Sequence, residues 1–212
     1  MNWRLPNQLT VARILLAGGF FVLVGQYEPG GGSGPILLNA AFVVYIVAGL
    51  TDILDGYLAR KMKITSAFGR IADPFVDKLL VVGAFAMLTG SNYMMPDGDP
   101  GQALPHWLTG GMQSAVQAWM AVVIIAREFV VSAVRGYSES CGVKFPATYA
   151  GKIKMFVQSV AICMILCQLA NLPDALWAIY VKVIWVWLAV AVTVVSGLAY
   201  VGKARRLLVA NE

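Results

Sequence analysis

The sequence predicts an all-α integral membrane protein with six transmembrane helices and both termini in the cytosol. Of its 212 residues, 59% are apolar and only 13% are charged, whereas a soluble domain usually carries about 25% charged residues. The apolar residues form six runs, each long enough for a span of about 20 residues. The basic residues lie mainly in the connections on one side of the predicted membrane. The composition, the apolar runs and the charge distribution together predict a single membrane domain over residues 1–212.

The six runs give the expected boundaries of the helices. Residues 1–7 are expected to form a short interfacial segment, because Trp3 and Arg4 are typical of membrane surfaces. The connection 27–35 is rich in glycine and is expected to be flexible, and residues 91–107 are expected to form a polar loop. The spans are expected over residues 9–26, 36–62, 71–88, 108–137, 150–169 and 175–201.

The distribution of positive charge predicts the orientation. When the connections are numbered alternately, fifteen of the sixteen lysines and arginines fall on one side, and Lys182 is the exception. Such an excess marks the cytosolic side of a membrane protein. The net charge of +5 is therefore attributed to orientation and to attraction for phosphate, and no nucleic-acid partner is expected.

Four aspartates stand out at the cytosolic ends of the second and third predicted spans. Asp52 and Asp55 are three apart, and Asp73 and Asp77 are four apart, so each pair shares one face of a helix. Ionised groups in a span are costly unless they are paired, hydrated or bound to metal. Carboxylate oxygens suit Mg²⁺ or Mn²⁺, which commonly bridge to phosphates. Two such ions can stabilise the attacking and leaving oxygens of a phosphoryl displacement, and a fourth carboxylate can accept a proton.

Small and basic residues accompany these acids. Gly56 and Ala59 leave space for a nucleotide base or a diphosphate beside the helix, and Arg60 offers a planar set of donors to a phosphate. A second basic group contains Arg127 and Arg135, which roughly share a helical face. Lys152, Lys154 and Arg70 could complete an anion pocket there. The alternative is that these cations only set the orientation of the chain.

Arg13 lies inside the first apolar run. It either faces the site or extends its side chain to the phosphate headgroups at the membrane surface.

The spacing of residues 52–77 resembles a known signature. Asp-x2-Asp-Gly-x2-Ala-Arg-x8-Gly-x3-Asp-x3-Asp is the pattern of the CDP-alcohol phosphotransferase family, and every specified position is filled. Its members are membrane enzymes with six helices, usually homodimers, that transfer a phosphatidyl or similar group from a CDP-linked donor to an alcohol and release CMP. The resemblance implies that Asp52, Asp55, Asp73 and Asp77 bind the metals, that Asp77 is also the general base, and that Asp52, Gly56, Ala59, Arg60 and Gly69 form the CDP pocket.

Three further segments are similar to one branch of this family. They cover residues 5–13, 125–135 and 151–154, and this branch uses CDP-diacylglycerol as the donor and sn-glycerol 3-phosphate as the acceptor. The similarity implies a bacterial inner membrane with the site facing the cytosol. The pair Phe75-Val76 departs from the small residues usual there, which concerns only local packing. The residues implied in binding the acceptor phosphate are Arg127, Arg135, Lys152, Lys154, Thr10, Arg13 and Arg70.

Two alternatives differ from this reading. The same fold can use another acceptor, such as inositol phosphate or serine, although serine has no phosphate to engage Arg127 and Arg135. A divalent-cation transporter would also place carboxylates within the membrane. Here, however, the acids lie together with arginines toward the cytosolic ends of the spans, and a path for cations would avoid such positive charge.

Overall fold

The computed structural model describes residues 5–62, 78–140 and 149–209. These ranges are helical, and their only strand-like contact is an isolated bridge between Met94 and Met112. The expectation of an all-α fold is therefore confirmed. The elements are α1 (Leu5–Gly25), α2 (Gly34–Met62), a helical segment Lys78–Met87, η1 (Ser91–Tyr93), η2 (Pro100–Ala103), α4 (His106–Thr109), α5 (Ala118–Ser140), α6 (Tyr149–Asn171) and α7 (Leu176–Val209).

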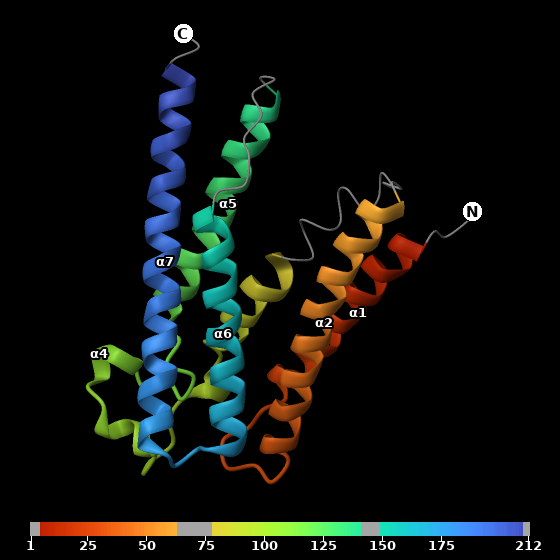
Figure 1. Ribbon diagram of the computed structural model, residues 1–212. Helices are drawn as coiled ribbons and strands as arrows, with labels where there is room; N and C mark the ends of the chain where they lie inside the picture. The colour runs from red at the N-terminus through yellow and green to blue at the C-terminus, as the bar shows by residue number, and fades with distance from the viewer. Residues whose placement is uncertain (1–4, 63–77, 141–148, 210–212) are drawn as a thin grey trace.

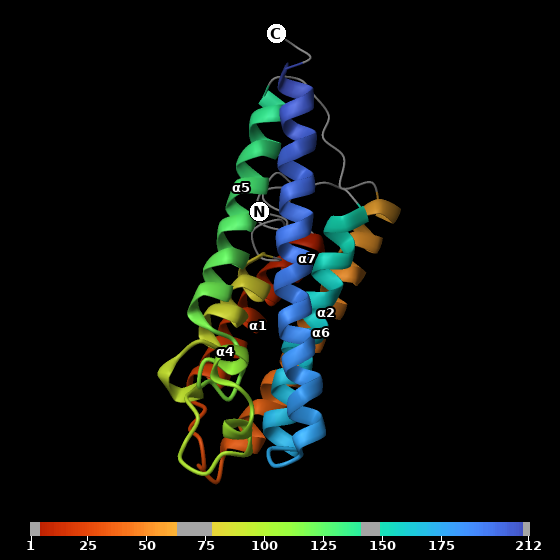
Figure 2. The same cartoon turned by 90° about the vertical axis from the view of Figure 1, so that its left-hand side faces the viewer.

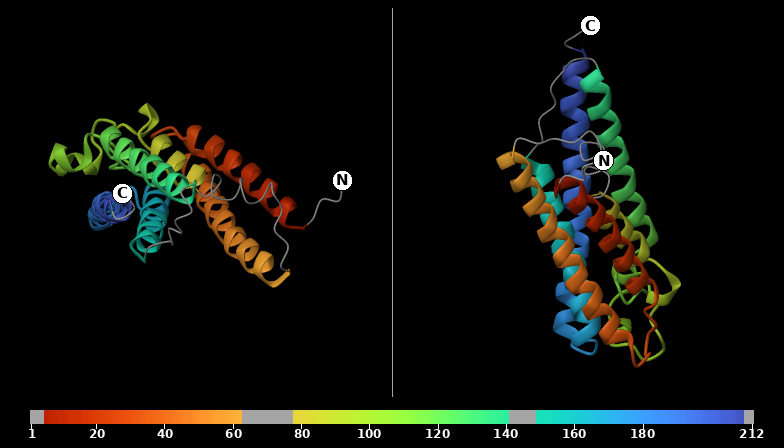
Figure 3. Two further views of the ribbon diagram at one scale, coloured as in Figure 1. Left: turned by 90° about the horizontal axis from the view of Figure 1, so that it is seen from above. Right: turned by 90° about the vertical axis from the view of Figure 1, so that its right-hand side faces the viewer.

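Two helical hairpins form the framework of the bundle. α1 packs on α2, and α6 packs on α7, while α2 also contacts α6 and α5 contacts α7. Figure 1 shows α2 and α6 close together at the end that carries the short connections and diverging toward the other end. Figure 2 shows α5 running beside α7. Seen from above in Figure 3, the segment Lys78–Met87 lies between α1 and α5.

Aromatic and small side chains set the close contacts of the core. Phe20 packs against Phe21 and Tyr45, with ring centroids 5.7 and 5.5 Å away. A Cβ atom at Gly83 would lie only 2.4 Å from Cζ of Phe21, so glycine permits the segment Lys78–Met87 to approach α1. Phe20 is fully buried, and in a bilayer such contacts stabilise the bundle through van der Waals packing, because lipid tails are as apolar as the side chain.

Within the described ranges, three helices contain stretches long and apolar enough to cross a membrane: Gly34–Asp52, Gly151–Asn171 and Leu176–Gly202. Shorter apolar helices cover Val11–Gly25 and Lys78–Met87. The expectation of a helical membrane protein agrees with these stretches, and six spans and the cytosolic termini remain predictions.

The expected boundaries hold for α2 and α6 to within two residues. α1 begins at Leu5, inside the expected interfacial segment, because Pro6 is well suited to a first helical turn. α7 continues to Val209, eight residues beyond the expected end.

The fourth helix was expected from residue 108, and this start is wrong. α4 ends at Thr109 and α5 begins only at Ala118. Gly110, Gly111 and Ala115 between them have positive φ angles of 63°, 73° and 59°, which a right-handed helix cannot contain. The apolar run therefore bends before it becomes helical.

Residues 91–107 are more ordered than a polar loop would be. Tyr93 is fully buried and stacks on Tyr27, with ring centroids 4.9 Å apart, and its hydroxyl donates to the Val24 carbonyl at 2.9 Å. Burial raises the pKa of both tyrosines, and the nearby Asp99 raises that of Tyr27 further. We call this end of the bundle the loop end; it comprises residues 26–33, 88–117 and 172–175.

Lys182 joins the elements of the loop end. This side chain is buried, and its ammonium donates to the Gln113 carbonyl and, at 2.7 Å, to Oε1 of Gln168. The Gln113 side chain donates to Asp99 at 2.6 Å and accepts from the Tyr27 hydroxyl at 3.0 Å. Lys182 is the one basic residue outside the predicted cytosolic group, and it forms its hydrogen bonds within the protein.

We expect Lys182→Met to destabilise the fold. The change leaves two buried acceptors without their donor, which costs about 1–3 kcal/mol each. Thermal unfolding of the full chain in detergent measures the effect. Lys152→Met, at an exposed position of α6, is the control, and equal stability of the two variants would contradict the role of Lys182.

Candidate active site

The described part of the aspartate signature begins at Asp52 on α2. Nη1 of Arg13, from α1, lies 2.9 Å from Oδ1 of Asp52. The Arg13 side chain is 5% exposed, whereas that of Asp52 is 38% exposed. Arg13 therefore pairs with the first aspartate of the signature from within the bundle, and its role in the site remains a prediction. We call this end of the bundle, opposite the loop end, the signature end.

The rest of the signature is only partly described. α2 is helical through Asp55, Gly56, Ala59 and Arg60, so the backbone has the three-residue spacing that the pairing of Asp52 with Asp55 requires. The side chains of these four residues, and the predicted site residues Gly69, Arg70, Asp73 and Asp77 as a whole, lie outside the described residues. Among the residues that the structure describes, no group of three metal-binding side chains occurs.

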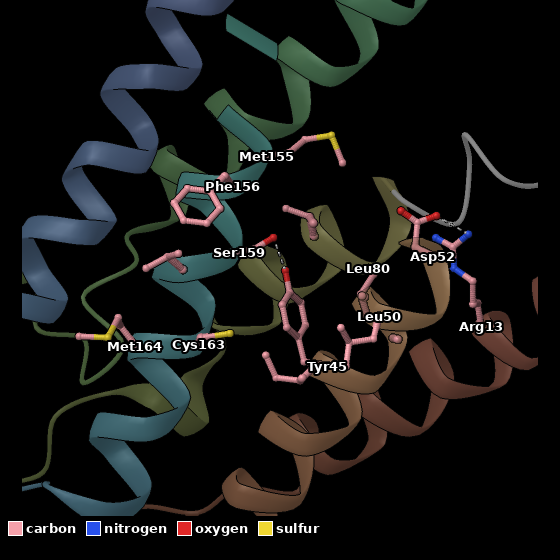
Figure 4. Close-up of a pocket in the computed structure, with 15 residues that line it drawn as sticks. Arg13, Tyr45, Leu50, Asp52, Leu80, Met155, Phe156, Ser159, Cys163 and Met164 are labelled. Carbon is pink, nitrogen blue, oxygen red and sulfur yellow. Dashed lines mark hydrogen bonds and ion pairs between the residues drawn. The ribbon is translucent and has the colours of Figure 1, made fainter. Parts of the chain in front are cut away.

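An apolar groove leads from Asp52 along α2 and α6. Its volume is about 440 Å³. Figure 4 shows Asp52 and Arg13 at one end of it, with Met155 and Phe156 facing from α6. Inside it, the Tyr45 hydroxyl donates to Oγ of Ser159 at 3.2 Å and joins the two helices. This wall suits hydrocarbon, and the polar end suits a charged group.

A cluster of buried charges, which we call the Glu128 cluster, joins α5 and α6. It consists of Arg127, Glu128 and Lys154. Oε1 of Glu128 accepts from Nη1 of Arg127 at 2.9 Å and also from the Lys154 ammonium. The three side chains are only 10%, 11% and 4% exposed, respectively. Lys154 directly precedes Met155 of the groove, so the cluster and Asp52 lie at the same end of the bundle.

Arg127 is held in a narrow space. A Cβ atom at Gly197 of α7 would lie 3.1 Å from Cγ of Arg127, so glycine provides the room for the stem of the arginine. Nε of Arg127 is buried and has no hydrogen-bond partner among the described residues. A buried donor of this kind costs free energy unless an acceptor reaches it, and a phosphate oxygen is a suitable acceptor.

The other predicted cations have different surroundings. Nε of Arg135 donates to the Tyr200 hydroxyl of α7 at 3.3 Å. Lys152 is exposed, because residues two apart on a helix do not face the same side. Thr10 lies in α1, and its side chain is outside the described residues. The structure thus joins Arg127 to Lys154 and leaves Lys152 outside the cluster.

Two polar residues of this region carry no role in the sequence analysis. The Lys78 ammonium donates to Oγ of Ser132, and the Ser132 hydroxyl donates to the Glu128 carbonyl at 2.6 Å. Ser132 lies four residues after Glu128, so the spacing in the sequence could have predicted that the two are neighbours on one helix. The contact of Lys78 with Ser132 depends on how separate segments pack, and nothing in the local sequence predicts it.

A helical bundle with a carboxylate on an apolar groove and buried cations at the same end suits a ligand that carries both hydrocarbon and phosphate. The family model described as CDP-alcohol phosphatidyltransferase matches residues 3–195. The chain belongs to this family.

Several relatives share one name, CDP-diacylglycerol–glycerol-3-phosphate 3-phosphatidyltransferase. The protein of Bacillus subtilis is 34% identical over 207 residues, covering 95% of both chains. That of Shigella flexneri is 31% identical over 209 residues and 97% of both chains. That of Haemophilus influenzae is 28% identical over 213 residues, covering 100% of this chain and 98% of the relative.

We expect Arg13 and Asp52 to be energetically coupled. A double-mutant cycle with Arg13→Met and Asp52→Asn, read by unfolding in detergent, should give a coupling of about 1 kcal/mol. The half-exposed carboxylate limits the value through solvent screening. Additive effects of the two substitutions would show that the ion pair contributes nothing to stability.

Proposed function

We propose that this protein transfers the phosphatidyl group of CDP-diacylglycerol to sn-glycerol 3-phosphate, giving phosphatidylglycerophosphate and CMP for phospholipid biosynthesis. The observation that carries the proposal is the Glu128 cluster, whose buried cations lie at the same end as the signature. A phosphate-bearing acceptor matches these cations. The names of the relatives over nearly the whole chain support the same reaction.

The donor would lie along the groove. Its acyl chains match the apolar walls formed by α2 and α6, and its diphosphate matches the polar end at Asp52. Since lipid tails are as apolar as these walls, the acyl chains can move from the bilayer into the groove without exposure to water. The CDP group would contact the residues implied by the signature, which are Asp52, Gly56, Ala59, Arg60 and Gly69.

Divalent metal, expected as two ions of Mg²⁺ or Mn²⁺, fits the donor set of this site. The Asp52 carboxylate is partly exposed toward the groove and provides the hard oxygen ligand that these ions prefer. Asp55, Asp73 and Asp77 would complete the set. When bound, the metal neutralises negative charge on the diphosphate and on the departing phosphate.

The acceptor phosphate would be held by the buried cations. Arg127 and Lys154 provide the central donors, and Arg135 is the next cation along α5. Lys152, Thr10 and Arg70 complete the set that the family resemblance implies. Arg13, because it pairs with Asp52, would position that carboxylate.

The transfer step exchanges one bond at the phosphorus of the phosphatidyl group for another. Asp77 takes the proton of the primary hydroxyl of glycerol 3-phosphate. The oxygen forms a bond to the phosphorus of the phosphatidyl group, the bond from this phosphorus to the CMP oxygen breaks, and CMP departs. Residues on α5 and α6 hold the acceptor while this occurs.

We further propose the setting of this reaction. The excess of basic residues on one side supports cytosolic termini and a site that faces the cytosol. The six apolar runs support six spans, and the similarity to one branch of the family supports the inner membrane of a bacterium. The family resemblance supports a homodimer in contact with membrane lipids.

We expect the purified full chain to release CMP from CDP-diacylglycerol only when glycerol 3-phosphate and a divalent cation are both present. Chelation should lower the rate about 100-fold or more, because metal contributes several kcal/mol to such displacements. Radiolabelled donor with each candidate acceptor provides the measurement. Faster turnover with serine or inositol phosphate would assign another acceptor to this site.

The same assay tests Asp77 as the general base. Asp77→Asn should lower kcat by about 100-fold or more, which is the usual contribution of a positioned base. Asp174→Asn, at an exposed position of the turn between α6 and α7, is the matched control. Normal turnover by Asp77→Asn in the presence of Mg²⁺ would exclude this role.

A further inference from the structure

The Glu128 cluster contains one residue that a phosphate site does not need for binding. A carboxylate repels a phosphate, yet Glu128 lies between the two cations assigned to the acceptor. It is 11% exposed, and a buried carboxylate is costly unless it is paired. Its presence among phosphate-binding groups therefore requires a reason other than contact with the ligand.

The reason lies in the geometry of the hydrogen bonds. A single oxygen, Oε1, accepts from both Arg127 and Lys154, although these two residues come from different helices and lie 27 positions apart. The cations would repel each other without this shared acceptor. Glu128 thus fixes the separation and direction of both donors.

The surroundings hold Glu128 and Arg127 in turn. Ser132 bonds to the Glu128 carbonyl and accepts from Lys78, which brings a third cation to the cluster. On the other side, Gly197 limits where the stem of Arg127 can lie. Nε of Arg127 is left without a protein acceptor among the described residues.

The balance of charge favours an anionic ligand. Arg127, Lys154 and Lys78 carry three positive charges, and among the described residues Glu128 is the one acid in this cluster, where it contacts Arg127 and Lys154 while Lys78 bonds to Ser132. Glu128 can offset part of this charge while it orients the donors. The remaining positive charge matches a phosphate.

We propose that Glu128 is a positioning residue that holds Arg127 and Lys154 together as one binding unit for the phosphate of the acceptor. This inference rests on the proposed function and deepens it. Glu128 acts through the two cations and does not contact the substrate. The Glu128 carboxylate accepts from Nη1 of Arg127 and leaves Nε, which has no acceptor in the part of the chain that the structure describes, available to the ligand.

The test is the Glu128→Gln variant of the full chain, with each substrate varied separately in the CMP-release assay. We expect KM for glycerol 3-phosphate to rise about tenfold or more, because loss of one partner from a buried charge pair has an effect of this size. KM for CDP-diacylglycerol should stay unchanged. Glu128→Asp should recover part of the loss, and Glu28→Gln, exposed at the loop end, should change neither value.

A purely structural ion pair gives a different result. In that case Glu128→Gln lowers the unfolding temperature and the active fraction, and KM for glycerol 3-phosphate is unchanged, which overturns the proposal.

A second variant covers the outcome in which Glu128→Gln fails to fold. Gly197→Ala retains every charge but displaces Arg127, because the added Cβ meets its Cγ at 3.1 Å. We expect KM for glycerol 3-phosphate to rise at least threefold. Gly202→Ala, on the same helix with nothing within 4 Å of the added Cβ, is the control. Equal KM values for these two variants would overturn the proposal.

A binding measurement that does not depend on turnover tests the positioning role of Glu128 separately from the proposed function. If the wild type releases no CMP with glycerol 3-phosphate, the proposed function fails. Calorimetry with inorganic phosphate and the full chain then decides the inference alone. Phosphate binding at least tenfold weaker in Glu128→Gln supports the positioning role, and equal binding overturns it.

Discussion

The pairing of buried charges is the constraint on which the rest of this structure depends. An ionised side chain inside an apolar bundle is strongly destabilising unless an opposite charge or a hydrogen bond compensates it. At the signature end, Asp52 meets Arg13, and Glu128 meets Arg127 and Lys154. These pairs join α1 to α2 and α5 to α6. The charges proposed to take part in the chemistry therefore also connect the helices that carry them.

The two ends of the bundle compensate their buried charges in different ways. At the loop end, Lys182 satisfies its charge within the protein through Gln113 and Gln168, and aromatic packing of Tyr27 on Tyr93 closes the surface. At the signature end, α2 and α6 diverge along an apolar groove that leads to Asp52 (Figures 1 and 4). A closed end and an open end suit a protein that admits a lipid substrate from one side.

Local patterns in the sequence predicted the helices and the chemical class of the site. The apolar runs fix α2 and α6 closely, and the spacing of Asp52 and Asp55 on one helix agrees with the helical backbone of α2. The late start of α5 was not predicted, because alanine rarely adopts the left-handed backbone conformation found at Ala115, so its presence in the sequence gives no indication of a bend. The sharing of Glu128 by Arg127 and Lys154 depends on how two separate helices pack, and periodicity within one segment contains no information on that contact.

The proposed mechanism requires that the carboxylates of the signature gather divalent cations at the same end of the bundle as the buried cations Arg127 and Lys154. Anomalous scattering from crystals of the full chain grown with Mn²⁺ and CDP-diacylglycerol measures it most directly. We expect manganese within about 2.3 Å of an oxygen of Asp52, with further ligands from Asp55, Asp73 and Asp77. Manganese bound elsewhere, with Asp52 bearing only its contact to Arg13, would contradict it.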